Sequence, residues 1–161
     1  MLNHASQGRR QAGVTLVELL IAMFILSIII AFGVPSFREA TANAALRGTT
    51  MDLVAALNTA RAESVNLRVP VTFAPTDAAD WSQGWDITYP VDQAAEDRSF
   101  GVRPGITVEE ENGLLTMEFR ANGTVDSDAV FIICDGRPNE TGRRIEINRL
   151  GRMTNQEFAC Q

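Results

Sequence analysis

The sequence contains no lysine and only one histidine, and all 14 of its basic residues are arginines. The histidine, His4, lies among the polar residues that precede a long apolar run. Without lysine the chain cannot form a Schiff base. Because no histidine follows position 4, the rest of the chain cannot form a serine–histidine or cysteine–histidine couple or a histidine metal site. These absences nearly exclude classical catalysis, so we expect neither an enzyme nor a bound cofactor.

Positive charge is also scarce. The 14 arginines stand against 20 aspartates and glutamates, which gives a formal net charge of −6. A protein that binds nucleic acid or anionic membranes over its whole surface is usually basic, so here only a local patch could do so. About 126 of the 161 residues follow Pro35, which is enough for one modest core and not for two.

The most prominent feature is an apolar run, GVTLVELLIAMFILSIIIAFGVP, from Gly13 to Pro35. Between Val14 and Val34 only Glu18 is strongly polar. A helix of this length spans about 31 Å at ~1.5 Å per residue, enough to cross a bilayer core. Keeping a carboxylate there costs ~2.5 kcal/mol or more, so Glu18 is a functional candidate that needs a partner.

Gly13, followed by the sequence VTLVE at positions 14–18, resembles the class III leader of type IV pilins and type II secretion pseudopilins. The resemblance implies that a prepilin peptidase cuts the bond between Gly13 and Val14 on the cytoplasmic side. It also implies that the new terminus at Val14 is methylated and that the apolar helix stays attached. Val14 departs from the family pattern, in which the first mature residue is usually phenylalanine.

Cleavage would give Glu18 a natural partner. Cutting after Gly13 frees an α-amino group, which is cationic at neutral pH because its ordinary pKa is ~8. The carboxylate of Glu18, in the same or a neighbouring subunit, could pair with it and lower the cost of keeping both charges in lipid. Pairing between subunits would set the axial register of a growing filament.

A cleaved secretory signal is the alternative interpretation of the same run. Ala31-Phe32-Gly33 has the small-x-small pattern of a signal-peptidase site, and Arg9 and Arg10 would form its charged n-region. The run is, however, longer than the h-region of about 7–15 residues, and it carries Glu18, which an export signal does not need. We therefore favour the pilin-like interpretation.

The leader also predicts the orientation. Residues 1–13 carry two arginines, which the positive-inside rule keeps in the cytoplasm. Residues 14–35 then cross the inner membrane once and the rest enters the periplasm. The resemblance implies later transfer to a pilus or pseudopilus, near its tip. Without the leader the chain keeps 12 arginines and all 20 acidic residues, a formal net charge of −8.

Pro35 is expected to end or kink the first helix, because it lacks the N–H that would bond the carbonyl of Ala31. Residues 36–68 resume an alanine-rich helical pattern, whose first part would continue the membrane helix and whose second part would pack on a sheet. Its apolar residues recur mostly every three or four positions as one stripe. The stripe comprises Leu46, Met51, Leu53, Val54, Leu57, Ala60 and Val65.

Over residues 69–161 the period changes to alternation, which predicts a periplasmic β domain. The expected fold class is α+β, with a long N-terminal pilin helix packed on one or two antiparallel sheets. Asn122-Gly123 suits a tight hairpin turn. The strand signals are Val69/Val71/Phe73, Trp85/Ile87/Tyr89, Phe100/Val102, Ile106/Val108, Leu115/Met117/Phe119, Val130–Ile133 and Ile145/Ile147.

Several segments resemble the GspH/FimT/FimU branch of the pilin superfamily, namely LR at 46–47, ARAESV at 60–65, PVT at 70–72, FRANGT at 119–124, ICD at 133–135, RIEI at 144–147 and GR at 151–152. The resemblance implies a minor type IV pilin that helps to prime or cap pilus assembly. Its partners would be other minor pilins, the major pilin, the prepilin peptidase and the inner-membrane assembly platform. The alternative is pseudopilin H at the tip of a type II secretion pseudopilus, with other pseudopilins as partners.

Three further groups are interpreted as structural. Trp81 and Trp85 could form an aromatic ligand platform, but their spacing favours packing. Arg61 and Glu63 are interpreted as a solvated helix face. A third group consists of acidic residues that lack the spacing of an EF-hand. They are interpreted as solvated side chains on loops, in preference to a calcium or glycosidase site. These acids are Asp92/Glu96/Asp97, Glu109–Glu111 and Asp126/Asp128.

Cys134 and Cys160 are the two cysteines, and both fall in the segment expected to be exported. In an oxidising periplasm a disulfide is the leading interpretation. It would close a separation of 26 residues, which is worth about 3–4 kcal/mol in the loop-entropy model. The alternatives are two free thiols and, less favoured, a metal site.

Five arginines lie close together in the sequence, at Arg137, Arg143, Arg144, Arg149 and Arg152. Such a patch could contact phosphates. The branch members used for DNA uptake carry a Gly-Arg-x-Arg motif here, whereas this chain reads Gly-Arg-Met-Thr at 151–154. Because the second arginine is missing, DNA binding is a third function and not the favoured one. Its candidate contacts are Arg143, Arg144, Arg149 and Arg152.

Overall fold

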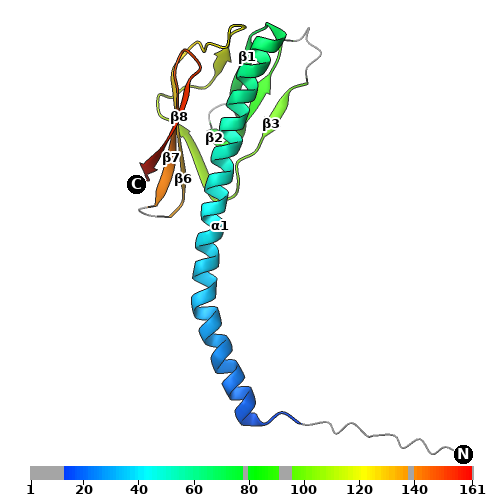
Figure 1. Ribbon diagram of the computed structural model, residues 1–161, viewed down its shortest axis with the longest axis vertical. Coiled ribbons are helices and arrows are strands. Elements are labelled where there is room, and N and C mark those ends of the chain that lie inside the picture. The colour runs from blue at the N-terminus through cyan, green and yellow to red at the C-terminus, as the bar shows by residue number, and fades with distance from the viewer. Residues whose placement is uncertain (1–12, 78–79, 91–95, 138–139, 161) are drawn as a thin grey trace, which may run out of the picture. The chain divides into compact units, whose positions relative to one another are not determined.

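The computed structural model describes residues 13–77, 80–90, 96–137 and 140–160. The predicted leader, with His4, Arg9 and Arg10, therefore lies outside the described residues except for Gly13, and so does Asp92. One helix, α1 (Leu16–Leu67), precedes the strands. The strands are β1 (Val71–Asp77), β2 (Asp80–Thr88), β3 (Arg98–Phe100), β4 (Ile106–Glu110), β5 (Met117–Phe119), β6 (Ala129–Asp135), β7 (Thr141–Ile147) and β8 (Met153–Ala159) (Figure 1).

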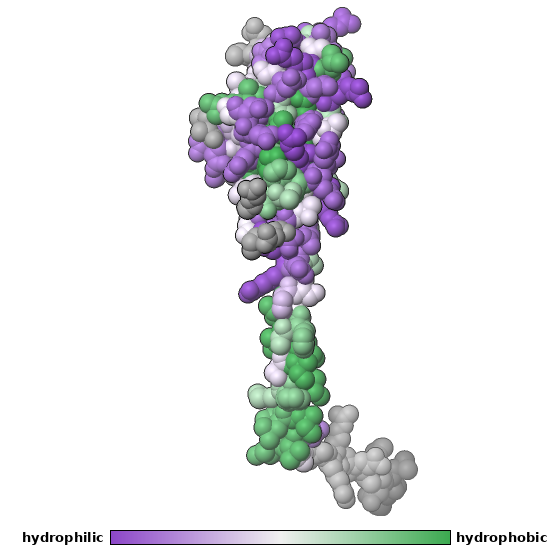
Figure 2. All heavy atoms as spheres, turned by 90° about the vertical axis from the view of Figure 1, so that its left-hand side faces the viewer, coloured by the Kyte–Doolittle hydropathy of each residue, from purple (hydrophilic) through white to green (hydrophobic). Residues whose placement is uncertain are grey.

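The chain forms two compact units, residues 1–39 and residues 40–161. In the first unit α1 is surrounded by exposed apolar side chains, and it is the helix in the described part of the chain that is long and apolar enough to cross a membrane. Figure 2 shows this apolar surface, whereas the face it shows of the second unit is mostly polar. The apolar run is therefore a helix whose side chains are not buried within the unit. Such a helix suits a segment that lies in a bilayer or packs against other helices.

Pro35 does not end the helix. α1 continues through it for more than 30 residues, to Leu67. Proline removes one backbone hydrogen bond of a helix but leaves the turns on either side free to form. Alanine-rich sequence follows directly after Pro35, and it favours continuation of the helix.

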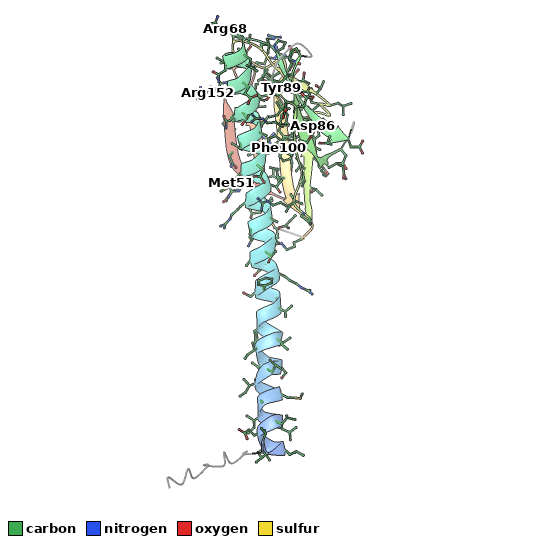
Figure 3. The ribbon with its side chains drawn as sticks, turned by 90° about the vertical axis from the view of Figure 1, so that its right-hand side faces the viewer. Met51, Arg68, Asp86, Tyr89, Phe100 and Arg152 are labelled. Atoms are coloured by element: carbon green, nitrogen blue, oxygen red, sulfur yellow. A yellow bond between two sulfur atoms is a disulfide. The ribbon has the colours of Figure 1, made fainter. Side chains whose placement is uncertain are left out.

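The second half of α1 buries a stripe that includes polar residues. The buried positions are Leu46, Thr49, Thr50, Leu53, Ala56, Leu57, Ala60 and Ser64. The stripe predicted from apolar residues was wrong at Met51 and Val65, whose side chains are 68% and 45% exposed (Figure 3). Hydroxyl groups can occupy the buried face because they bond to their own helix: Thr50 Oγ1 donates to the carbonyl of Leu46 at 2.8 Å, and Ser64 Oγ to that of Arg61 at 2.8 Å.

Two antiparallel sheets complete the second unit, with strand orders β3-β2-β1-β5 and β4-β6-β7-β8. This confirms the predicted α+β class and shows that the described strands form two sheets. The sheets meet where Ser82 of β2 reaches β4: the Val108 N–H donates to Ser82 Oγ at 2.9 Å, and that hydroxyl donates to the Val108 carbonyl at 3.2 Å. One core joins α1 to both sheets.

The predicted tryptophan packing is confirmed. Trp81 and Trp85 are buried, and Trp81 lies edge-on to Phe131 with ring centroids 4.9 Å apart. Phe73 stacks on Trp81 at 5.6 Å, and Trp81 Nε1 donates to the carbonyl of Leu114 at 2.9 Å. Aromatic side chains from three strands thus fill the space between the sheets.

The predicted strands are present with shifted ends. Val69, Tyr89, Val102 and Leu115 lie just outside the strands in which they were expected. One strand, β8, had no predicted counterpart. Its sequence, MTNQEFA, shows no apolar alternation because most of its residues are exposed.

Candidate functional site

The N-terminal site is formed by the turn that starts α1. Gly13, Val14 and Thr15 are described but not helical, and the helix begins at Leu16. Thr15 caps it: the Glu18 N–H donates to Thr15 Oγ1 at 3.2 Å, and the Leu19 N–H donates to the Thr15 carbonyl at 3.1 Å. The bond between Gly13 and Val14 is thus outside the helix, and Glu18 lies in its first turn.

Glu18 is an exposed acid among exposed apolar residues. Its position in the first turn favours a negative charge, because free N–H groups give a helix N-terminus a partial positive charge. An exposed carboxylate here is available to an intermolecular cation. This arrangement suits the assembly role expected of Glu18, which stays a prediction.

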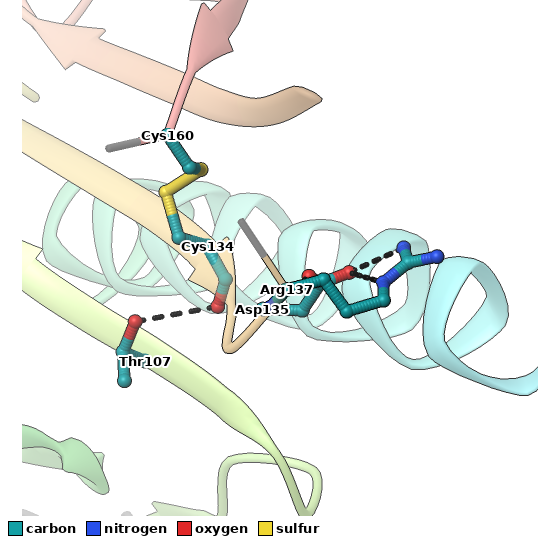
Figure 4. The surroundings of a disulfide bond; sticks show 5 residues. All are labelled: Thr107, Cys134, Asp135, Arg137 and Cys160. Carbon is teal, nitrogen blue, oxygen red and sulfur yellow. Dashed lines mark hydrogen bonds and ion pairs between the residues drawn. A yellow bond between two sulfur atoms is a disulfide. The ribbon is translucent and has the colours of Figure 1, made fainter. Parts of the chain in front are cut away.

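The expected disulfide between Cys134 and Cys160 is present, with Cα atoms 6.0 Å apart (Figure 4). It joins the end of β6 to the residue after β8 and passes over β7 at Gly142. A Cβ atom at Gly142 would clash with both sulfur atoms and with the Ile133 carbonyl. The bridge across a central strand therefore depends on a glycine in that strand.

Next to the disulfide, an ion pair ties the end of β6 to α1. Both the side-chain Nη2 of Arg137, at 2.6 Å, and its Nε, at 3.1 Å, donate to Asp135 Oδ2. Arg137 Nη2 also donates to Asn43 Oδ1 at 2.7 Å. Hydrogen bonding to the Arg137 side chain holds the pKa of the buried Asp135 carboxyl below its ordinary value. This cluster fastens the sheet to the helix.

The five arginines of segment 137–152 do not form one patch. Arg137 pairs with Asp135, Arg143 with Glu157 at 3.7 Å, and Arg144 with Glu111 and Glu146. The hydrogen bond that the Arg144 guanidinium donates to the Glu111 carboxylate raises the pKa of Arg144. Arg143 and Arg144 are neighbours in β7 and so point to opposite faces of the sheet.

Arg149 and Arg152 remain together at the turn between β7 and β8, where both are exposed (Arg152 in Figure 3). The side chain of Asn148 organises this turn by accepting from the N–H groups of Leu150 and Arg152 at 3.1 and 3.0 Å. Of the four candidate DNA contacts, the structure brings only these two together as exposed, unpaired groups among the described residues.

Arg61 and Glu63 do not form the solvated face that was predicted. Arg61 Nε donates to the carbonyl of Gly123 at 3.0 Å, and its Nη2 to that of Leu150 at 3.4 Å. Glu63 accepts a hydrogen bond from the hydroxyl of Tyr89 and forms an ion pair with Arg98 at 3.0 Å. Both side chains are half-buried and join α1 to loops and strands that are distant in sequence.

The acidic residues within the described segments mostly serve the backbone. Glu110 accepts from the N–H groups of Asn112, Leu114 and Val130. The carboxylates of Asp97, Asp126 and Asp128 each accept a hydrogen bond from one backbone N–H group. The donors are the N–H groups of Tyr89, Glu118 and Arg149, respectively. Carboxylates engaged with N–H donors hold loop conformation. Most of the predicted acids in the described segments are also solvent-exposed, as expected.

Comparisons with known proteins agree with this architecture. The family model described as Type II transport protein GspH matches residues 49–151, and the model of the prokaryotic N-terminal methylation motif matches residues 8–34. No curated protein matches.

Two crystal structures of the type IV minor pilin FimU from Pseudomonas aeruginosa are similar, each at 27% identity. The match to the first has a TM-score of 0.63 and covers 75% of this chain and 96% of the FimU chain. The match to the second has a TM-score of 0.61 and covers 72% of this chain and 98% of the FimU chain.

The GspH match covers more than half of the chain, and the N-terminal motif agrees with it, as do the long helix and the two sheets of the described residues. Members of this family are structural subunits that assemble with other pilins or pseudopilins, and the apolar helix with its methylation motif indicates a membrane-anchored chain. The chain therefore belongs to the GspH family of pilin-like proteins.

Proposed function

We propose that the protein is a minor type IV pilin that helps to prime or cap pilus assembly. The similarity to FimU, which extends over 96% of the FimU chain, is the observation that supports this choice most directly. FimU is a type IV minor pilin by its own description. The Glu18 carboxylate has no hydrogen-bonding or ionic partner among the described residues, and the Gly13–Val14 bond is not helical. Both features agree with a subunit that is processed and then assembled.

In this proposal a prepilin peptidase cuts after Gly13 at the cytoplasmic face, and the α-amino group of Val14 is methylated. The chain waits in the inner membrane with residues 40–161 in the periplasm. The assembly platform then extracts it, and Glu18 pairs with the terminal amine of an adjacent pilin subunit. A position near the tip follows from a priming or capping role.

Pseudopilin H of a type II secretion system is the second candidate, and the description of the matching family favours it. The two roles use the same anchor helix and the same two-sheet unit. They differ in the neighbouring subunits, so the geometry of one subunit serves both.

DNA binding is the least supported function. Three of the five arginines are engaged in ion pairs, and only Arg149 and Arg152 form an exposed pair. The duplex affinity of the purified protein and of an Arg149→Ala/Arg152→Ala variant would be compared at low salt. A clear loss of binding in the variant would restore this function, and equal or absent binding removes it.

Deleting the gene and scoring surface pili and secreted enzymes in the same strain tests the proposal. We expect fewer or no surface pili and unchanged enzyme secretion, both restored by the wild-type gene. Loss of secretion with normal pili would assign the protein to the secretion system. No change in either would contradict both roles.

A further inference from the structure

β8 forms an open edge of the second sheet. The strand order β4-β6-β7-β8 leaves it paired on one side only, with all seven residues in register with β7 from Met153, opposite Ile147, to Ala159, opposite Thr141. Such an edge presents a row of backbone donors and acceptors to whatever lies beside it.

The hydrogen bonds at the two ends of this ladder identify the groups that point outward. The Cys160 N–H donates to the Glu140 carbonyl at 3.0 Å, and the Asn148 N–H donates to the Arg152 carbonyl at 3.1 Å. Even-numbered residues of β8 therefore face β7, because the two sides alternate along an antiparallel strand. The odd-numbered residues, Met153, Asn155, Glu157 and Ala159, direct their N–H and C=O groups to the open side, where no described residue bonds them.

The other sheet edges are short or already occupied. β3 and β5 have only three residues each. The outer edge of β4 is engaged, because Ser82 bonds both the N–H and the carbonyl of Val108. β8 is thus the longest open edge among the described strands.

β8 also lacks the features that usually protect such an edge. It contains no proline and no lysine, and its single charged residue is Glu157. Glu157 is 3.7 Å from Arg143 of β7, but its side chain is 72% exposed, so it can pair with a further cation. On the other face, a hollow of about 770 Å³ is lined by residues that include Ile132, Phe158 and the disulfide.

A second copy of the chain does not fit this edge through its own β8 strand. A twofold axis would pair two β8 strands in the antiparallel sense. β8 runs beside residues 40–67 of α1 in the opposite direction (Figure 1), so those helix segments of the two copies would then point in opposite directions. Subunits inserted into one membrane by the same end must share one direction, which excludes such a pair.

We propose that the open edge of β8 takes up a strand from a different pilin-type subunit, which extends the second sheet. This inference rests on the proposed function, because it needs a filament neighbour in the periplasm. The recognised strand carries a cationic side chain beside Glu157 and an apolar side chain toward the hollow at Phe158. Backbone hydrogen bonds supply the attraction, and these two side chains supply the selectivity.

Replacing Asn155 with proline tests the interface without removing a hydrogen bond of the fold. The Asn155 N–H points outward, so Asn155→Pro removes a donor from the interface and none from the ladder with β7. Asn155→Ala keeps the donor and is the matched control. Disulfide formation and resistance to protease report whether each variant is folded. Ala159→Pro with Ala159→Ser gives a second pair at another outward position, which is exposed, should Asn155→Pro not fold.

The test places a photo-crosslinking residue at Gln156, an exposed position of β8 that leaves Glu157 and Phe158 intact, in the full-length chain in cells. A control carries it at Ser99 of β3, on the other sheet. Adducts are identified by mass spectrometry. We expect an adduct with another pilin-type subunit from position 156 and not from position 99. Its yield should fall about tenfold when Asn155→Pro is added and should be unchanged with Asn155→Ala.

Each other outcome is informative. An adduct with a second copy of this chain, an adduct that Asn155→Pro does not reduce, or no adduct in a strain that assembles pili overturns the edge interface and leaves the proposed function standing. If deletion of the gene affects neither pili nor secretion, the proposed function itself fails.

Discussion

Gly142 permits the disulfide to exist where it does. Sheet positions usually carry a side chain that packs on a neighbour, yet at this one the two sulfur atoms occupy the space. The role of this glycine is steric and does not depend on an unusual backbone angle. Spacing in the sequence could not reveal it, because Cys134, Gly142 and Cys160 meet only when three strands are paired.

Gly142→Ala should therefore prevent or strain the disulfide. If the bond still forms, we expect a loss of about 1–3 kcal/mol in the free energy of unfolding, from overpacking. If it does not form, the loss should approach the ~3–4 kcal/mol of the cross-link. Free-thiol titration and urea unfolding measure the two effects. Gly136→Ala is the control, since a Cβ there meets nothing within 4 Å, and an equal effect of both changes would contradict the steric explanation.

Asp135 predicts a pH dependence of stability. Because its pKa in the folded protein lies below the ordinary value of 3.8, the ionised carboxylate favours the folded state. This contribution is complete above the ordinary pKa and is lost as the pH falls through the lower folded value. Asp135→Asn should cost about 1–3 kcal/mol near pH 7, and the difference from wild type should shrink below about pH 4. A difference that is constant from about pH 7 to pH 2 would contradict it.

At the scale of elements, the sequence predicted what hydrophobic periodicity encodes. The long helix, most strands and the tryptophan packing were predicted because each buries apolar residues at the period of its own structure. β8 was missed because an edge strand exposed on both faces has no such period. Arg61 and Glu63 were misassigned because their partners lie across the fold, as far as 89 residues away along the chain.

Arg61 joins α1 to the turns at Gly123 and Leu150, and both Gly123 and Gly151 leave room for it. Arg61→Ala should destabilise the protein by about 1–3 kcal/mol, because two backbone carbonyls lose a charged donor. Arg47→Ala removes an exposed arginine from the same helix and should cost less than about 0.5 kcal/mol. Thermal unfolding of the two variants provides the comparison, and similar losses would show that the contacts of Arg61 contribute nothing special.

At the scale of the whole molecule, the two units differ in what surrounds them. Residues 40–161 bury their own core, whereas the helix of residues 16–39 exposes apolar side chains that need lipid or other helices. The sequence predicted the anchor from length and composition alone. It could not predict the neighbouring subunits, since partner choice depends on surfaces such as the β8 edge that have no local signature.

The central claim is that the apolar helix becomes part of a filament core and that Glu18 is required for this incorporation. Its most direct test is the amount of Glu18→Ala protein in filaments sheared from cells, relative to the amount in the membrane. Glu39→Ala, an exposed acid further along α1, is the control. We predict that Glu18→Ala protein accumulates in the membrane with a normal disulfide but is strongly depleted from sheared filaments, while Glu39→Ala protein matches wild type. Recovery of Glu18→Ala protein in filaments at the wild-type level would contradict the account.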